Sequence, residues 1–174
     1  ISLQQLDGIA FGEGPGSFTG LRIACGVAQG LAFAMNIPVV GVSTLKALAT
    51  QVGNAKVVVA LDARMGEIYY AAYEKITDQD WKTVNAPILC TPRNVPNLTG
   101  NDWVGCGSGF DVFNNELSER YCNHIRETRS GLFPRAKEIV QLALPVLKCG
   151  NGIHPSEAVP SYIRNKVALK ESER

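Results

Sequence analysis

The sequence has no excess of charge of either sign, no clustered cysteines or histidines, and no long uninterrupted apolar run. Lys and Arg number 17 against 16 Asp and Glu, so no overall field attracts the chain to nucleic acid or to an anionic membrane. The longest apolar stretch, residues 21–35, is short for a membrane span and contains Arg22 and Gln29. No signal-peptide pattern occurs either, so neither secretion nor a membrane-spanning helix is expected.

Metal-ligand spacing is also missing. The five cysteines are scattered without a CxxC pair, which is typical of reduced thiols in a cytoplasmic protein. His124 and His154 are far apart in the sequence, which favours isolated histidines over a metal site. We therefore expect a cytoplasmic protein without a bound metal or other cofactor.

The composition is that of an ordinary folded protein, with 174 residues of which 45% are hydrophobic and 19% charged. The first twelve residues resemble the end of a helix that runs into a strand, rather than the start of a domain. We therefore expect a further N-terminal segment ahead of Ile1.

The order of the expected elements is that of an α/β protein. A strand at 7–12 leads through a glycine turn into a helix at 19–35, and a strand at 37–43 precedes a helix capped by Ser43. This alternation predicts parallel strands. An antiparallel hairpin, a second strand-glycine-helix passage and a C-terminal helix that Pro145 should kink or shorten follow. Their ranges are 56–63, 67–74 and 84–90 for strands, 102–109 for a strand that ends in glycines, and 91–96, 110–120 and 134–150 for helices.

The stretch GEGPGSFTGLR, residues 12–22, is the first candidate site. Backbone N–H groups at a glycine turn before a helix can hold an anion. The residues that would contact it are Gly14, Gly16, Ser17, Thr19 and Arg22. The stretch lacks the lysine of a P-loop and the spacing of a dinucleotide fingerprint. The alternative is structural, with the glycines making the turn and Ser17 or Thr19 capping the helix.

The helix expected at 19–35 is apolar around most of its circumference, because its polar residues are spaced by seven and form one narrow stripe. Glycines at i, i+4 would let another helix approach closely. One side can meet the protein's own sheet, and the other needs a helix from an N-terminal segment or from a second subunit, unless the domain itself covers it. The predicted partner-interface residues are Arg22, Gly26, Gln29, Gly30 and Phe33.

Two further stretches could contact a nucleotide. Asp62, at the end of a strand, could bind a metal-bound phosphate or a water, and Arg64 could pair with an anion; the alternative is that both stabilise the turn. Gly107, in VGCGSGF, would allow a base to approach the backbone, or it only makes a strand-to-helix turn. Cys106 has no histidine nearby in the sequence, which disfavours a nucleophile.

Three stretches together resemble the TsaB (YeaZ) family, the bacterial subunit of the tRNA threonylcarbamoyladenosine system. They are GIAFGEGPGSFTGLRIACGVAQGLAFAMNIPVVGVSTLKALA, VVVALDARMGEIYYAAY and PSYIRNKVA. The resemblance implies the actin-like ATPase (ribonuclease H-like) α/β fold, with two duplicated lobes. The family begins with a strand, a hairpin and a helix that this chain does not contain, so the first lobe is expected to be incomplete. The implied division is 1–55 for the rest of the N-terminal lobe and 56–174 for the C-terminal lobe with its tail.

The resemblance also implies a noncatalytic role. The catalytic relative, TsaD, carries metal-binding histidines where this chain has GVSTLKALA, residues 41–49. The implied function is that of a scaffold that forms a heterodimer with TsaD, is joined by TsaE, contacts tRNA only through the complex and forms a homodimer when alone. The product of that system is a modified adenosine after the anticodon in tRNAs that read codons starting with A.

Two other functions remain as alternatives. An ATP-binding, kinase-like enzyme of the same superfamily would need a pair of magnesium-binding carboxylates, for which only Asp62 offers itself. A glycoprotease-like peptidase would need an activated nucleophile or a metal-bound water, which the residue spacing does not provide.

Overall fold

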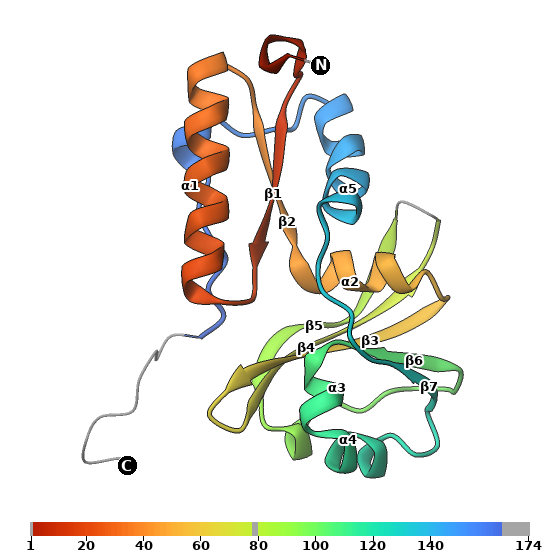
Figure 1. Ribbon diagram of the computed structural model, residues 1–174. Coiled ribbons are helices and arrows are strands. Elements are labelled where there is room, and N and C mark those ends of the chain that lie inside the picture. The colour runs from red at the N-terminus through yellow and green to blue at the C-terminus, as the bar shows by residue number, and fades with distance from the viewer. Residues whose placement is uncertain (1, 78–79, 165–174) are drawn as a thin grey trace, which may run out of the picture.

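The computed structural model describes residues 2–77 and 80–164 (Figure 1). The strands are β1 (Ile9–Gly14), β2 (Val39–Ser43), β3 (Lys56–Arg64), β4 (Glu67–Lys75), β5 (Trp81–Cys90), β6 (Trp103–Cys106) and β7 (Ile125–Arg129). The α-helices are α1 (Phe18–Met35), α2 (Thr44–Val52), α3 (Ser108–Val112), α4 (Asn114–Arg120) and α5 (Ala136–Lys148). Three short 3₁₀ helices are η1 (Leu3–Gln5), η2 (Pro92–Asn94) and η3 (Pro155–Glu157).

The strands form two sheets. β1 and β2 pair in parallel, whereas the second sheet has the order β5-β4-β3-β6-β7. Within it, β3 and β4 form the expected antiparallel hairpin, and β6 is parallel to both β3 and β7. The predicted α/β class, its parallel strands and its hairpin are therefore confirmed.

The two sheets contain a repeated unit, in which a strand, one or two helices and a parallel neighbouring strand follow one another. β1, α1 and β2 make the first copy, and β6, α3 with α4, and β7 make the second. In the second sheet β3 pairs with the other edge of β6. Within the described part of the chain, no strand pairs with the corresponding edge of β1. The first sheet thus has two of the five strand positions that the second sheet fills.

The C-terminal part of the chain returns to the first sheet. α5 packs against β1 and β2 (Figure 1), and Ile153 forms an antiparallel bridge with Val39 at the outer edge of β2. Farther along, the backbone N–H of Ser161 donates to the carbonyl oxygen of Glu13 at 2.7 Å. The division after residue 55 stays a prediction, but residues 136–161 pack on the first sheet rather than extending the second lobe.

Helix α1 lies on one face of the first sheet. Its buried residues, Leu21, Cys25, Ala28 and Ala32, are spaced by four, three and four, which places them on one stripe. Together with Phe11, Val39 and Ala158 the last three of them form a small apolar core. Of the two larger apolar clusters, one lies on a face of the second sheet, and the other is shared by the second sheet, β2, α2 and α5.

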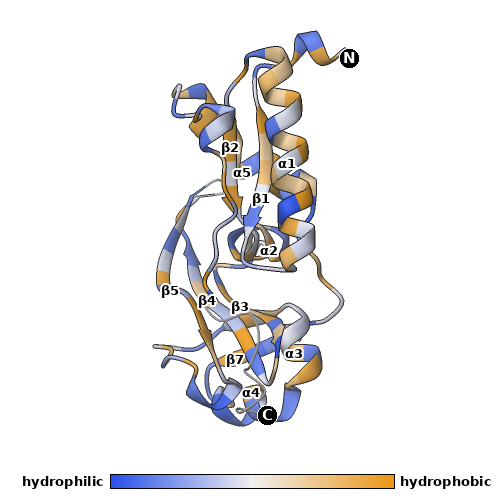
Figure 2. Cartoon of the chain, turned by 90° about the vertical axis from the view of Figure 1, so that its left-hand side faces the viewer, coloured by the Kyte–Doolittle hydropathy of each residue, from blue (hydrophilic) through white to orange (hydrophobic). Residues whose placement is uncertain are grey.

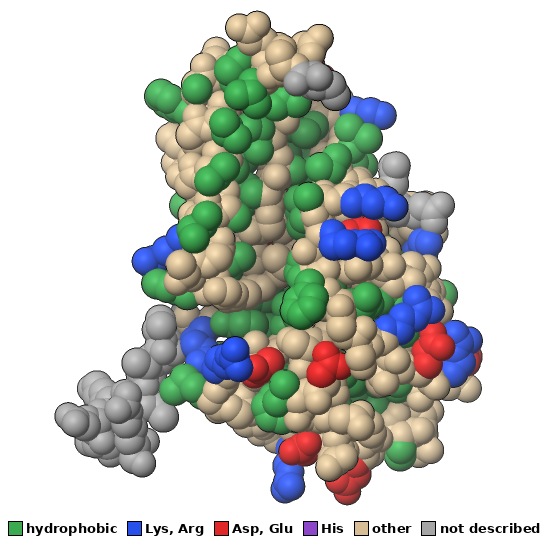
Figure 3. Space-filling view, viewed as in Figure 1, with side chains coloured by type: hydrophobic (Ala, Val, Ile, Leu, Met, Phe, Trp, Pro, Cys, Tyr) green, Lys and Arg blue, Asp and Glu red, His purple; other side chains and the backbone are tan. Residues whose placement is uncertain are grey.

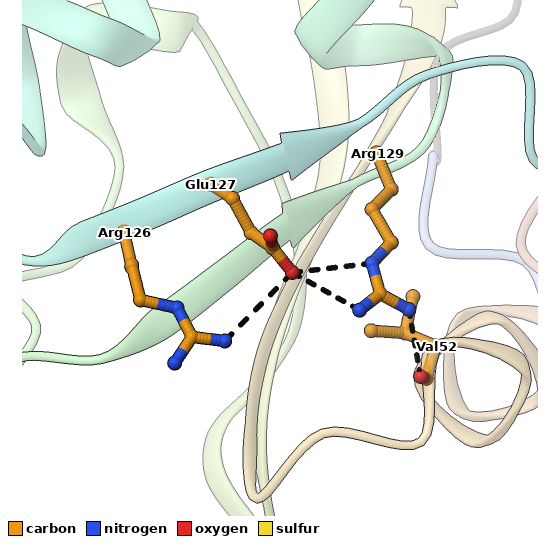
Figure 4. Close-up of polar contacts among 4 residues, drawn as sticks. All are labelled: Val52, Arg126, Glu127 and Arg129. Carbon is orange, nitrogen blue, oxygen red and sulfur yellow. Dashed lines mark hydrogen bonds and ion pairs between the residues drawn. The ribbon is translucent and has the colours of Figure 1, made fainter.

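Two elements differ from the sequence prediction. The helix expected at 110–120 is two helices, α3 and α4, that break at Phe113, where φ is −117° and ψ is 39°. The sequence does not predict β7, because the stretch IRETR has no apolar alternation. In the structure four of its five residues are exposed. Figure 4 shows its polar contacts: Arg126 and Arg129 both turn to Glu127 within the strand, and Arg129 also joins the strand to α2 by donating to the carbonyl oxygen of Val52 at 3.1 Å. Charged side chains of this kind also protect an edge strand from further pairing.

Candidate functional site

Among the described residues, α1 carries more exposed large hydrophobic side chains than any other helix or strand. Large hydrophobic residues on this helix are 38% to 68% exposed. They are Phe18, Ile23, Val27, Leu31 and Phe33. In the space-filling view, hydrophobic side chains gather on the upper part of the molecule around α1, whereas charged side chains lie mainly lower and to the right (Figure 3). A face with several exposed large hydrophobic side chains is typical of an interaction surface.

Two glycines make a notch in this face. A Cβ added at Gly26 or at Gly30 would meet no atom within 4 Å, so both positions open directly to the outside of the helix. They lie in a shallow groove of about 490 Å³. Its walls are Gly26, Gln29, Gly30, Phe33, Ala34, Pro155 and Ser156. The two open glycine positions agree with the i, i+4 spacing of the sequence, and the packing of another helix there stays a prediction.

One wall of this groove could not be found from the helix alone. Pro155 and Ser156 belong to η3, and the carbonyl oxygen of Ala158 accepts a hydrogen bond from Gln29 Nε2 at 2.9 Å across 129 residues of sequence. The Cys25 thiol donates to the same oxygen at 3.3 Å. In the sequence, η3 is indicated only by the proline of the HPSE stretch, because proline is common at the first position of a helix.

The predicted interface residues are thus arranged in two ways. Gly26, Gly30 and Phe33 line the groove and are open to the outside of the helix, whereas Gln29 also holds the C-terminal segment on the helix. Arg22 is exposed but engaged, since its guanidinium carbon lies 3.7 Å from the centre of the Phe18 ring and its Nε donates to the Tyr162 hydroxyl at 3.0 Å. Their role in an interface stays a prediction, with Arg22 and Gln29 already having partners within the chain.

The length of α1 corrects one expectation from the sequence. With 18 residues it is long and apolar enough to cross a membrane by length and composition alone, whereas the apolar stretch of the sequence predicts a segment too short to do so. Figure 2 shows apolar segments along most of α1. The helix nevertheless packs one face on β1 and η3 of the same chain, as a helix that covers a sheet of a folded domain does.

The glycine loop before α1 has the structural arrangement that the sequence left open. The Ser17 hydroxyl accepts from the backbone N–H of Gly20 at 3.4 Å and caps the helix. Gly14 has φ of +121°, and a Cβ there would lie 2.8 Å from the Ser161 carbonyl oxygen, so only glycine fits. Gly16 lines a small cavity of about 60 Å³ beside Tyr162 and Arg164, and Thr19 is exposed.

The other predicted nucleotide contacts are used by the chain itself. Asp62 Oδ1 accepts from the backbone N–H of Arg64 at 2.8 Å, and the two side chains form an ion pair at 3.2 Å. Gly107 has φ of +97°, and a Cβ there would lie 2.4 Å from the Ala60 carbonyl oxygen. None of these three residues lines the cavity beside Gly16. The structure therefore does not bring the predicted anion contacts together in one pocket.

Burial sets the chemistry of the Cys106 thiol. Burial raises the pKa of the Cys106 thiol to about 12, against the smaller opposing effect of Arg129, so at neutral pH the thiol is protonated and a poor nucleophile. Among residues 2–77 and 80–164 no group of three His, Cys, Asp or Glu side chains is placed to hold a metal ion.

Comparison with known proteins gives the family. The family model described as "TsaD: tRNA N6-adenosine threonylcarbamoyltransferase" matches residues 1–171. The "tRNA threonylcarbamoyladenosine biosynthesis protein TsaB" of Escherichia coli (strain K12) is 35% identical over 98% of this chain and 76% of its own length. The protein of the same name from Haemophilus influenzae is 34% identical over 98% of this chain and 75% of its own length.

Solved structures agree. One, "YeaZ from Pseudomonas aeruginosa", superposes with a TM-score of 0.83 at 35% identity and covers 93% of this chain and 76% of that one. Another, an uncharacterized P. aeruginosa protein with "similarity to peptidase YEAZ", gives a TM-score of 0.84 at 35% identity, over 94% of this chain and 76% of that one. The expected actin-like ATPase fold is confirmed, and its first lobe is incomplete in this chain. The chain belongs to the TsaB (YeaZ) family.

Proposed function

We propose that the protein acts in tRNA threonylcarbamoyladenosine biosynthesis as a noncatalytic subunit that docks on TsaD through helix α1. The relatives named above support the pathway. The observation that carries the docking surface is the outward notch at Gly26 and Gly30 on an exposed apolar helix face. TsaE would join this pair in a ternary complex in the cytoplasm, and tRNA would be contacted only through the complex.

The match to the TsaD family model supports this choice of partner. Because the model covers residues 1–171 of this chain, a TsaD subunit is expected to share the fold and to carry a helix equivalent to α1. Two such helices can pack about a pseudo-twofold axis, in which each presents the same face to the other. A second copy of this chain would use the same face, which gives a homodimer when TsaD is absent.

The noncatalytic role has positive support in how the polar groups are used. Ser17 caps α1, Asp62 holds a turn, and the Cys106 thiol has a raised pKa. Each of these groups would otherwise be a candidate for phosphate binding, magnesium binding or nucleophilic attack. In the proposed complex, metal and nucleotide chemistry belong to TsaD.

The test is the mass of the complex, measured by light scattering after the protein is mixed with TsaD. We expect a heterodimer for the natural sequence and separate subunits for Gly30→Leu, because a leucine there fills the notch. Asn115→Leu, which places a leucine on the exposed surface of α4, serves as the control and should leave the heterodimer intact. An intact heterodimer with Gly30→Leu would refute the assigned surface.

Two other functions are tested directly. A kinase-like enzyme requires ATP binding, so saturable heat of ATP binding to this protein alone that is lost with Asp62→Asn would favour it. Proteolysis is favoured only by the similarity to a structure that is itself described as resembling a peptidase. Cleavage of an unfolded substrate protein by the purified chain would be needed to sustain that hypothesis.

A further inference from the structure

A second cavity lies on the other side of the first lobe, away from the α1 groove. It has a volume of about 580 Å³, within the range of small-molecule sites. Its walls come from β1, β2, the start of α2, the end of α5 and the connection between β4 and β5. They are Glu13, Val40, Gly41, Val42, Ser43, Lys46, Thr77, Asp80, Leu142, Pro145 and Val146. Most of this lining is apolar, with charged groups at separate points.

Glu13 reaches this cavity across β2. It stands on β1, beside Gly41 of the neighbouring strand, and a Cβ at Gly41 would lie 2.4 Å from Glu13 Oε2. The missing side chain of Gly41 therefore leaves the space in which the carboxylate lies. Within the described residues this carboxylate has no hydrogen-bond or ion-pair partner, and burial alone raises its pKa.

Lys46 lines the same cavity from the first turn of α2. Its backbone N–H donates to the capping Ser43 hydroxyl at 3.4 Å, but the ammonium group of this half-buried residue has no partner in the part of the chain that the structure describes. No ion pair joins it to Glu13. The cavity thus contains the unpaired carboxylate of Glu13 and the unpaired ammonium group of Lys46, and Asp80 adds a second carboxylate to its lining.

Unpaired charges that lose hydration lower stability, and a ligand with complementary charges restores their contacts. We propose that this cavity binds a zwitterion of the α-amino acid class, with its ammonium group on Glu13, its carboxylate on Lys46 and an apolar side chain against α5. The site is independent of the α1 surface and of the proposed function. Charge-assisted hydrogen bonds at both ends give it a preference for molecules that carry both groups.

The test compares L-leucine with its two halves in calorimetry and in amide NMR titrations of the protein. The halves are 3-methylbutylamine, which lacks the carboxylate, and 4-methylpentanoate, which lacks the ammonium group. We expect leucine to bind saturably at millimolar concentration, to shift the amide signals of Gly41 and Lys46, and to bind about 10-fold or more tightly than either half.

Variants separate the two ends of the site. Glu13→Gln should weaken leucine about 10- to 100-fold and leave 4-methylpentanoate unchanged, whereas Lys46→Met should do the same for leucine and leave the amine unchanged. Gly41→Ala keeps both charges but displaces the carboxylate, and should weaken leucine as Glu13→Gln does. Glu116→Gln, in α4, is the control and should change nothing.

Three results would overturn the proposal. They are the absence of a saturable response to leucine, equal affinity for leucine and for either half, and leucine affinity that is unaffected by both Glu13→Gln and Lys46→Met. Association with TsaD, measured on the same variants, should remain unchanged, so a failure of this site is distinguishable from a failure of the α1 interface.

Discussion

Replacing the two notch glycines by alanine should stabilise the isolated protein while weakening its assembly. Both positions lie inside α1 without a positive φ, and an added Cβ would meet no atom within 4 Å. Alanine is favoured over glycine in a helix by about 1 kcal/mol per position. The double variant, Gly26→Ala with Gly30→Ala, should thus gain about 2 kcal/mol in the free energy of unfolding. For a chain of this length that gain raises Tm by about 4 to 8 °C.

Association should change in the opposite direction, because the two methyl groups fill the notch into which the partner helix would fit. Overpacking of a close helix contact costs about 1 to 3 kcal/mol per site, so the Kd should rise by about 30-fold or more. Thermal unfolding of the dilute protein by circular dichroism measures the first effect, and calorimetry with TsaD measures the second. A stabilised variant that binds TsaD with unchanged affinity would refute the notch as the contact, and a destabilised one would show that the glycines serve the monomer.

Three further changes probe the rest of the structure. Gly107→Ala should lower the free energy of unfolding by about 3 kcal/mol or more in a urea titration, because φ is +97° and the methyl group meets the Ala60 carbonyl oxygen. Glu138→Gln should cost about 1 to 3 kcal/mol at neutral pH, since the hydrogen-bonded Arg135 guanidinium lowers the pKa of this buried carboxyl. The loss of stability caused by Glu138→Gln should shrink as the pH falls below 4.5, the ordinary pKa of a glutamate, because the parent then loses the charge of Glu138 as well. Glu13→Gln should have the reverse sign: burial raises the Glu13 pKa, so the charged form is disfavoured in the fold at neutral pH, and the variant's higher Tm should converge with that of the parent below pH 4.5.

Edge strands and short helices show where sequence patterns fail. β7 is held by its hydrogen bonds to β6 and by the hydrogen bond from Arg129 to the Val52 carbonyl oxygen, neither of which leaves an apolar period in the sequence. The break at Phe113 likewise has no glycine or proline to announce it. Such features depend on neighbours that are distant along the chain, so local propensity does not predict them.

The glycine motifs stand out in the sequence, but the sequence does not decide how they are used. GPGS could cap a helix or cradle an anion, since both uses need the same backbone N–H groups and small residues. The structure assigns Ser17 to the cap and places the Ser161 carbonyl where a side chain at Gly14 would stand. Similarly, Gly107, which directly follows β6, approaches Ala60 of β3, and these two strands are adjacent only in the folded sheet.

The α/β class, the hairpin, the apolar helix with its two glycines and the TsaB resemblance all follow from the sequence alone, because they depend on periodicity and on contiguous motifs. Two arrangements required the folded chain: η3 forms a wall of the α1 groove, and Glu13 reaches a cavity across Gly41. Both join segments that are distant in the sequence, and such neighbours are chosen by packing of the whole chain rather than by the residues of either segment.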